Sequence, residues 1–140
     1  DIWPNLKLIS TWTSGNCSTL LPALQVQLSS KSFIGEVGYM SSEFRGTVNL
    51  DIRNEIQVPT LNENFFEFVE RDVWGSKSPD FLMLHEIELG KEYYIFVTTQ
   101  NGLYRYFIND IIQVTGIHHK TPTIKFIQKG KIITGSINNE

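Results

Sequence analysis

One carboxylate stands in an unusual place in this sequence. Asp110 lies within the stretch NGLYRYFINDIIQVTG (101–116), where apolar and aromatic residues surround it. An ionised carboxylate among Ile108, Ile111 and Ile112 is costly unless it accepts hydrogen bonds, and two adjacent sugar hydroxyls are donors spaced to fit its two oxygens. Asp110 is therefore a candidate ribose-binding residue. Because Asn-Asp is also a common turn signal, a turn or cap is the alternative role.

A second polar cluster precedes Asp110 in the chain. The residues GYMSSE (38–43) follow the apolar run 33–37 and offer hydroxyls and one carboxylate. Such groups suit a magnesium ion bound to phosphate. Together with Asp110 they suggest a nucleotide site, although the Ser-Ser-Glu run would equally suit the first turn of a helix.

Composition limits the class of protein. The 140 residues are 41% hydrophobic, which suffices for one core and is most simply one domain. With 12 basic and 15 acidic side chains the net charge is −3, so the basic stripe that nucleic acid requires is not expected. The apolar runs are shorter than the roughly 20 residues that cross a bilayer, so no membrane partner is expected either. The single cysteine, Cys17, fits a reducing compartment, and we expect a cytoplasmic protein.

Strands supply most of the elements that must position these residues. Strands are predicted at 7–13 and 33–37, and between them a helix from Ser18, its N-cap, to Leu28, with Pro22 in the first turn. Such a unit favours parallel pairing of its two strands. Six further short strands are predicted at 45–50, 65–70, 92–99, 103–107, 111–115 and 123–128. The fold class is therefore α/β with strong β content, a strand-helix-strand unit followed by an antiparallel sheet or a small β-barrel.

Two connections have recognisable turn composition. Gln100-Asn101-Gly102 predicts a tight hairpin turn, because Asn-Gly tolerates positive φ angles. Residues 71–79, which include glycine, serine and proline, predict an exposed loop. Adjacent histidines at 118 and 119 would point apart on a strand, so no zinc site is expected.

Four segments together resemble one known family. They are GYMSSE (38–43), NFFEFVE (64–70), GKEYYIFVTTQNGLYRYFINDIIQVTG (90–116) and TPTIKFIQKGK (121–131). In order and spacing they are similar to the middle of the Gretchen Hagen auxin-responsive family, the acyl acid amido synthetases. That family belongs to the adenylate-forming superfamily with firefly luciferase. The resemblance covers essentially the whole chain and is closer to bacterial members than to the plant hormone-conjugating ones.

The resemblance implies an ATP-dependent ligase. In this family ATP and a carboxylic acid form an acyl-adenylate, and an amine, typically of an amino acid, then displaces AMP. The match implies nucleotide-binding roles for Tyr39, Ser41, Ser42 and Asp110, with Glu43 as the catalytic carboxylate on the magnesium side. The implied cofactors are ATP and magnesium.

Two further segments receive roles from the same match. Thr13-Ser14-Gly15 matches the loop that borders the acyl and adenine pocket. Lys129 and Lys131 fall where the chain approaches a hinge, so either could contact phosphate, serve the hinge or be an ordinary solvated charge.

The sequence departs from the plant pattern in one motif. Phe107 and Asn109 stand where that motif has Arg and Gly. Arg105 lies two positions from Phe107, on the same face of a strand by alternation, and could partly substitute as a nucleotide-binding residue.

The resemblance also implies that the chain is an excised piece of a larger adenylate-forming N-terminal domain. Residues 1–43 would end an α/β subdomain, 44–130 would form a β-barrel-like subdomain and 131–140 would start the hinge. The piece should pack against missing N-terminal and C-terminal parts of its own parent chain and be inactive alone. The alternative is a non-catalytic β-rich interaction or regulatory module derived from such an enzyme. These residues do not determine the acyl acid, the amine acceptor or the oligomeric state.

Overall fold

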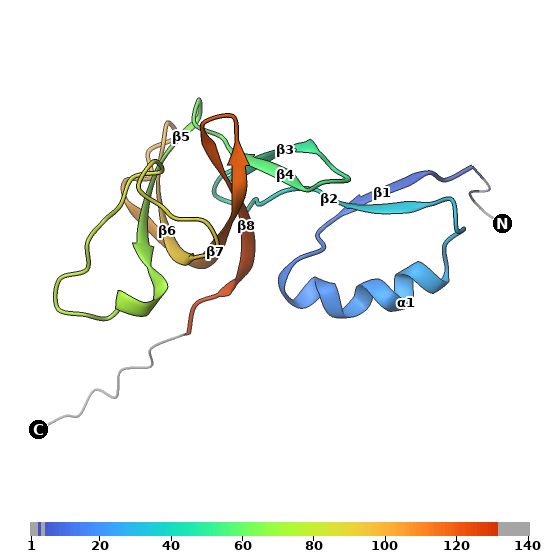
Figure 1. Cartoon of the computed structure of the whole chain (residues 1–140), viewed down its shortest axis with the longest axis horizontal. Coiled ribbons are helices and arrows are strands. Elements are labelled where there is room, and N and C mark those ends of the chain that lie inside the picture. The colour runs from blue at the N-terminus through green and yellow to red at the C-terminus, as the bar shows by residue number, and fades with distance from the viewer. Residues whose placement is uncertain (1–2, 4, 132–140) are drawn as a thin grey trace, which may run out of the picture.

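The computed structural model describes residue 3 and residues 5–131. In this part of the chain the strands form three sheets, which are a parallel pair, a small antiparallel pair and a four-stranded antiparallel sheet. Figure 1 shows the small antiparallel pair between the other two sheets. Most of the predicted hinge start, residues 132–140, lies outside the described residues. None of the helices described is both long and apolar enough to cross a membrane.

The N-terminal unit has the predicted strand-helix-strand form. Strand β1 (Leu8–Thr11) pairs in parallel with β2 (Phe33–Glu36), and between them lie a 3-10 helix, η1 (Gly15–Leu20), and helix α1 (Leu21–Val26). Pro22 sits in the first turn of α1, as predicted. The N-cap prediction is wrong, because Ser18 lies inside η1 and its hydroxyl donates to the Gly15 carbonyl at 2.7 Å.

The small antiparallel pair consists of one predicted strand and one that the sequence did not reveal. Strand β3 (Thr47–Asp51) pairs with β4 (Ile56–Pro59). The sequence does not reveal β4 because it has four residues, carries a polar side chain at Gln57 and ends on a proline. The chain reverses between the strands with Glu55 at a φ of 52°.

The larger sheet has the strand order β5-β6-β7-β8 and is antiparallel throughout. Its strands are β5 (Asn64–Glu70), β6 (Glu92–Thr99), β7 (Tyr106–His118) and β8 (Thr121–Lys129), with a short 3-10 helix, η2 (Arg71–Val73), after β5. Of the two predicted alternatives, the structure therefore has the open antiparallel sheet. The predicted hairpin turn connects β6 to β7, with Gly102 at a φ of 102°.

Strand β7 corrects the prediction of two separate strands on either side of Asn109-Asp110. Tyr94 of β6 pairs with Ile111 and Phe96 pairs with Phe107, so residues 108–110 stand opposite the single residue Ile95. Asn109 adopts a φ of 61°, a conformation that asparagine tolerates better than most residues. The Asn-Asp pair is therefore a bulge within one long strand, and not the turn or cap of the alternative prediction.

Both faces of the large sheet are covered by apolar side chains. In β6, Tyr93, Ile95 and Val97 belong to one cluster, whereas Tyr94 and Phe96 belong to a second cluster on the opposite face. This two-sided burial explains why β6 appears in the sequence as a continuous apolar run.

The loop after β5 covers the second face of this sheet. Trp74 lies in the segment predicted to be an exposed loop, yet its ring packs against Tyr94, Phe96 and Phe107 at centroid distances of 5.2, 5.6 and 4.8 Å. The prediction of exposure is therefore wrong at this residue.

Candidate functional site

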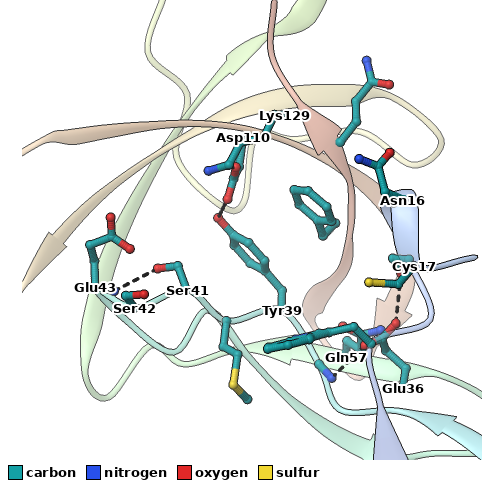
Figure 2. A pocket seen from close by; sticks show the side chains of 17 residues that line it. Asn16, Cys17, Glu36, Tyr39, Ser41, Ser42, Glu43, Gln57, Asp110 and Lys129 are labelled. Carbon is teal, nitrogen blue, oxygen red and sulfur yellow. Dashed lines mark hydrogen bonds and ion pairs between the residues drawn. The ribbon is translucent and has the colours of Figure 1, made fainter.

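A cavity of about 480 Å³ lies where elements of all three sheets meet. The segment after β1, the end of β2, residues 38–43, β4, β7 and β8 all contribute to its lining. Asp110 and Glu43, the two carboxylates that stand out in the sequence, both line it, as Figure 2 shows. A cavity of this volume is large enough for a small molecule.

Asp110 forms the polar centre of one end of the cavity. Its side chain is buried, and Tyr39 Oη donates a hydrogen bond to Asp110 Oδ2 at 2.7 Å. Lys129 Nζ lies 2.6 Å from Oδ1 as an ion pair, at an angle that does not meet that of a hydrogen bond. The protein itself therefore provides partners for this carboxylate, and Oδ1 keeps a lone pair for a further donor.

Tyr39 is held as a hydrogen-bond donor. Burial raises the pKa of its hydroxyl far above the ordinary value, and the negative charge of Asp110 raises it further. Its ring lies nearly parallel to that of Phe126, at a centroid distance of 5.8 Å. The phenol is therefore protonated at all physiological pH values and fixed in direction.

Glu43 is exposed at the rim of the cavity. Tyr106 Oη donates to Glu43 Oε1 at 3.3 Å, and hydrogen bonding with Ser41 lowers the pKa of the Glu43 carboxyl, so it is ionised at neutral pH. Ser41 Oγ accepts hydrogen bonds from the backbone N–H groups of Glu43 and Phe44 at 3.2 and 3.3 Å. This local arrangement is a hydroxyl-stabilised turn, so the alternative of a helix start is wrong. Ser42 also lines the cavity.

The predicted loop Thr13-Ser14-Gly15 borders the same cavity and is held by a residue that was not predicted. Glu36 is buried, and its Oε2 accepts hydrogen bonds from Thr13 N at 2.8 Å, Thr13 Oγ1 at 2.5 Å and Ser14 Oγ at 3.0 Å. Ser14 and Gly15 line the cavity, and Thr13 stands behind them. A Cβ at Gly15 would lie 2.9 Å from the Phe126 ring, and its φ is 59°, so glycine is required there.

Gln57 of β4 is a second lining residue that sequence reasoning missed. Its only signal is a polar side chain between two apolar ones, which is the pattern of any strand with one exposed face. For Glu36 the available signal was a lone carboxylate at the end of the apolar run 33–37.

Besides Thr13, two predicted site residues are not among those that line the cavity. Arg105 donates from Nε and Nη2 to the two carboxylate oxygens of Glu67, at 2.9 Å each, and its guanidinium lies over the Phe81 ring at 4.3 Å. Its φ of 44° places it in the turn before β7, so strand alternation does not apply to it. Lys131 is exposed and is not among the lining residues, whereas Lys129 is one of them.

Comparison with known proteins decides the family. The GH3 family central domain matches residues 57–129. The chain belongs to the GH3 family. The predicted resemblance is therefore confirmed at the level of the family.

Curated relatives and solved structures agree with this assignment. Indole-3-acetic acid-amido synthetase GH3.4 of Arabidopsis thaliana is 31% identical over 139 residues, covering 94% of this chain and 23% of that protein. The 4-substituted benzoates-glutamate ligase GH3.12 of the same plant is 32% identical over 136 residues, with the same coverage. The solved structure of the GH3.15 acyl acid amido synthetase has a TM-score of 0.77 at 25% identity, over 99% of this chain and 24% of that one.

The chain thus spans about a quarter of the length of the GH3 proteins that it matches. The structural likeness confirms the mixed α/β fold with its high strand content. These relatives are plant proteins, so the bacterial type stays a prediction.

Proposed function

We propose that this GH3 chain is the part of an ATP-dependent acyl acid amido synthetase that holds the ribose and the magnesium-bound phosphates of ATP, together with part of the acyl acid. The whole enzyme would form an acyl-adenylate from ATP and a carboxylic acid and pass the acyl group to an amine, typically of an amino acid. One observation carries the proposal: Asp110 and Glu43, far apart in the sequence, line one cavity of ligand size. The relatives named as amido synthetases and as a glutamate ligase support it.

The residues at this end of the cavity fit the nucleotide. Asp110, whose Oδ2 is fixed by Tyr39, offers Oδ1 to a ribose hydroxyl. Lys129 supplies positive charge beside it. Magnesium in nucleotide sites is bound by one or two carboxylates, by phosphates and by water, so the single exposed carboxylate of Glu43 fits such an ion. When bound, the ion would neutralise phosphate charge during adenylation.

The adenylate-forming superfamily and the bacterial type belong to the same proposal. The bacterial type rests on the resemblance carried by the four segments 38–43, 64–70, 90–116 and 121–131. A cytoplasmic location also stays a proposal, which rests on the single cysteine, Cys17.

Helix α1 supports the proposal that the chain packs against further parts of its parent protein. None of the residues in η1 and α1 is buried in the described structure, and Leu20, at the end of η1, and Val26, at the end of α1, are 69% and 81% exposed. A helix with uncovered apolar side chains of this kind requires a partner surface.

A non-catalytic module is the second candidate, favoured by one observation. Phe107, where the plant motif has a charged Arg, packs its ring on Trp74 and Phe96 at 4.8 and 4.9 Å. Phe107 therefore packs in the aromatic cluster and offers no positive charge to a nucleotide.

A pyrophosphate-exchange assay on the full-length protein with a panel of carboxylic acids separates the two candidates. If the protein is an enzyme, at least one acid of the panel should support exchange between pyrophosphate and ATP. If it is a non-catalytic module, none of the acids should support this exchange. In the enzyme, Asp110→Ala should weaken ATP binding in calorimetry, because the ribose loses an acceptor. Glu43→Ala should lower adenylation more than nucleotide binding, because it acts on the reacting phosphate. As a matched control, Glu55→Ala removes a carboxylate that pairs with Lys125 outside this cavity and should leave both unchanged.

A further inference from the structure

An unpaired hydrogen-bond donor lies at the other end of the cavity. Gln57 is 1% exposed, yet its Nε2 donates to no acceptor among the described residues, although the side chain lines the cavity. Asn49 Oδ1, on the residue that pairs with Gln57 across β3 and β4, is likewise unpaired, and no hydrogen bond joins the two side chains. Buried polar groups in native proteins nearly always have a partner, so an unpaired donor at a cavity wall is open to an acceptor on a ligand.

The direction of this amide is set by a chain of hydrogen bonds. Tyr39 N donates to Thr47 Oγ1 at 2.8 Å, and Thr47 Oγ1 donates its only hydrogen to Gln57 Oε1 at 3.2 Å. If the amide were turned round, the fully buried Thr47 hydroxyl would lose this acceptor. The Gln57 carbonyl therefore faces Thr47, and the NH2 group faces away from it.

The two ends of the cavity differ in charge. Figure 2 shows Gln57 beside Glu36, on the opposite side of Tyr39 from Asp110 and Lys129. Glu36 is a buried carboxylate that makes no ion pair with the described residues, so its surroundings are negative. A ligand carboxylate or phosphate is repelled there and is better placed at the end that carries Lys129.

The group that meets Gln57 is therefore neutral. Trp12, which is 52% exposed, and Met40 line the wall and offer apolar surface to the body of a ligand. The cavity thus suits a molecule with an anionic end, an apolar middle and a neutral hydrogen-bond acceptor at its far end.

We propose that Gln57 Nε2 donates a hydrogen bond to a neutral oxygen, a hydroxyl, ether or carbonyl, at the end of the acyl acid remote from its carboxyl group. This inference rests on the proposed function and names its substrate class, which is oxygenated carboxylic acids with an apolar body. An acid that ends in plain hydrocarbon leaves the buried NH2 group without an acceptor and binds more weakly for that reason.

The test compares two matched pairs of acids in pyrophosphate exchange by the full-length protein. The pairs are 4-hydroxyphenylacetate with phenylacetate and 6-hydroxyhexanoate with hexanoate. In the unchanged protein the hydroxy acid of at least one pair should have a kcat/KM roughly tenfold higher, as one hydrogen bond provides. In Gln57→Leu that ratio should fall below about twofold, because kcat/KM for the hydroxy acid falls while kcat/KM for the plain acid stays the same.

Two controls separate specificity from folding. Gln113→Leu removes an amide of the same size that donates to Gly90 O outside the cavity, and it should keep the full ratio. If a thermal melting curve shows that Gln57→Leu does not fold, Gln57→Met replaces it as the test variant, because its flexible side chain fills a similar volume. Equal rates for both acids of each pair in the unchanged protein, or a ratio that survives at Gln57→Leu, would overturn the inference while the adenylation function stands. Exchange with no acid would remove the proposed function and this inference together.

Discussion

The hydrogen bond between Tyr39 and Asp110 should be the strongest polar interaction in the site. Both side chains are buried, at 4% and 3% exposure, and the oxygens are 2.7 Å apart. A hydrogen bond to a charged group contributes about 1.5–3 kcal/mol. We therefore expect a double-mutant cycle of Tyr39→Phe and Asp110→Ala to give a coupling energy of about 2 kcal/mol. Tyr39→Phe keeps the ring that stacks on Phe126, so the cycle isolates the hydroxyl.

Urea unfolding of the 140-residue chain measures this coupling. With a slope of about 2 kcal/mol per molar urea, Tyr39→Phe should lower the midpoint by roughly 1 M. The matched control is Tyr106→Phe, which removes a hydroxyl that donates to the exposed Glu43 at 3.3 Å and should cost under about 0.5 kcal/mol. A Tyr39–Asp110 coupling below about 0.5 kcal/mol would refute the reasoning, because it would mean that burial does not strengthen this bond.

Three further outcomes follow from the same residues. The folded-state pKa of Tyr39 is raised, so its contribution to stability is complete below pH 10 and is lost at higher pH as the unfolded chain ionises. Between pH 10 and 11.5 the free energy of unfolding should therefore fall less steeply in Tyr39→Phe, by about 0.7 kcal/mol per pH unit at pH 10 and approaching about 1.4 at pH 11.5; equal slopes would contradict this. Glu36→Gln should weaken the three hydrogen bonds from Thr13 and Ser14 and lower the free energy of unfolding in urea by about 1–3 kcal/mol. It should also shift the NMR resonance of the Thr13 amide proton, and an unchanged resonance would contradict this prediction. Gly46→Ala places a Cβ 2.3 Å from Tyr39 Cδ1 and should cost about 1–3 kcal/mol; a melting temperature equal to that of the unchanged chain would show that the ring has room to move.

Much of the fold follows from local sequence patterns. The eight-residue strand β6 was predicted with its bounds, because apolar and aromatic side chains on both faces leave little choice of structure. Strand β4 was missed because four residues with one polar side chain carry too little pattern. Asn109 was misleading for a physical reason, since the positive φ that asparagine tolerates serves turns and bulges alike.

The candidate site was predictable only in part. The sequence shows that Asp110 needs a partner, but the tyrosine that provides it is 71 positions away, and only the tertiary fold brings the two together. Gln57 has no local pattern that separates it from an ordinary polar strand residue, and the only signal for Glu36 is a lone carboxylate in the apolar run 33–37. Strand alternation predicts that Arg105 shares a face with Phe107, and this prediction fails because the strand begins one residue later, at Tyr106.

The cavity lies at a seam between three sheets, so a bound molecule should change the stability of their junction. Among the described residues the strands pair only within their own sheets, so at this cavity the seam depends on side chains such as Tyr39, Phe126 and Gln57. A molecule that fills the cavity contacts residues of all three sheets at once and holds the sheets together. Binding should therefore stabilise the junction far more than the interior of any one sheet, and in the empty protein loosening by heat should begin at this junction.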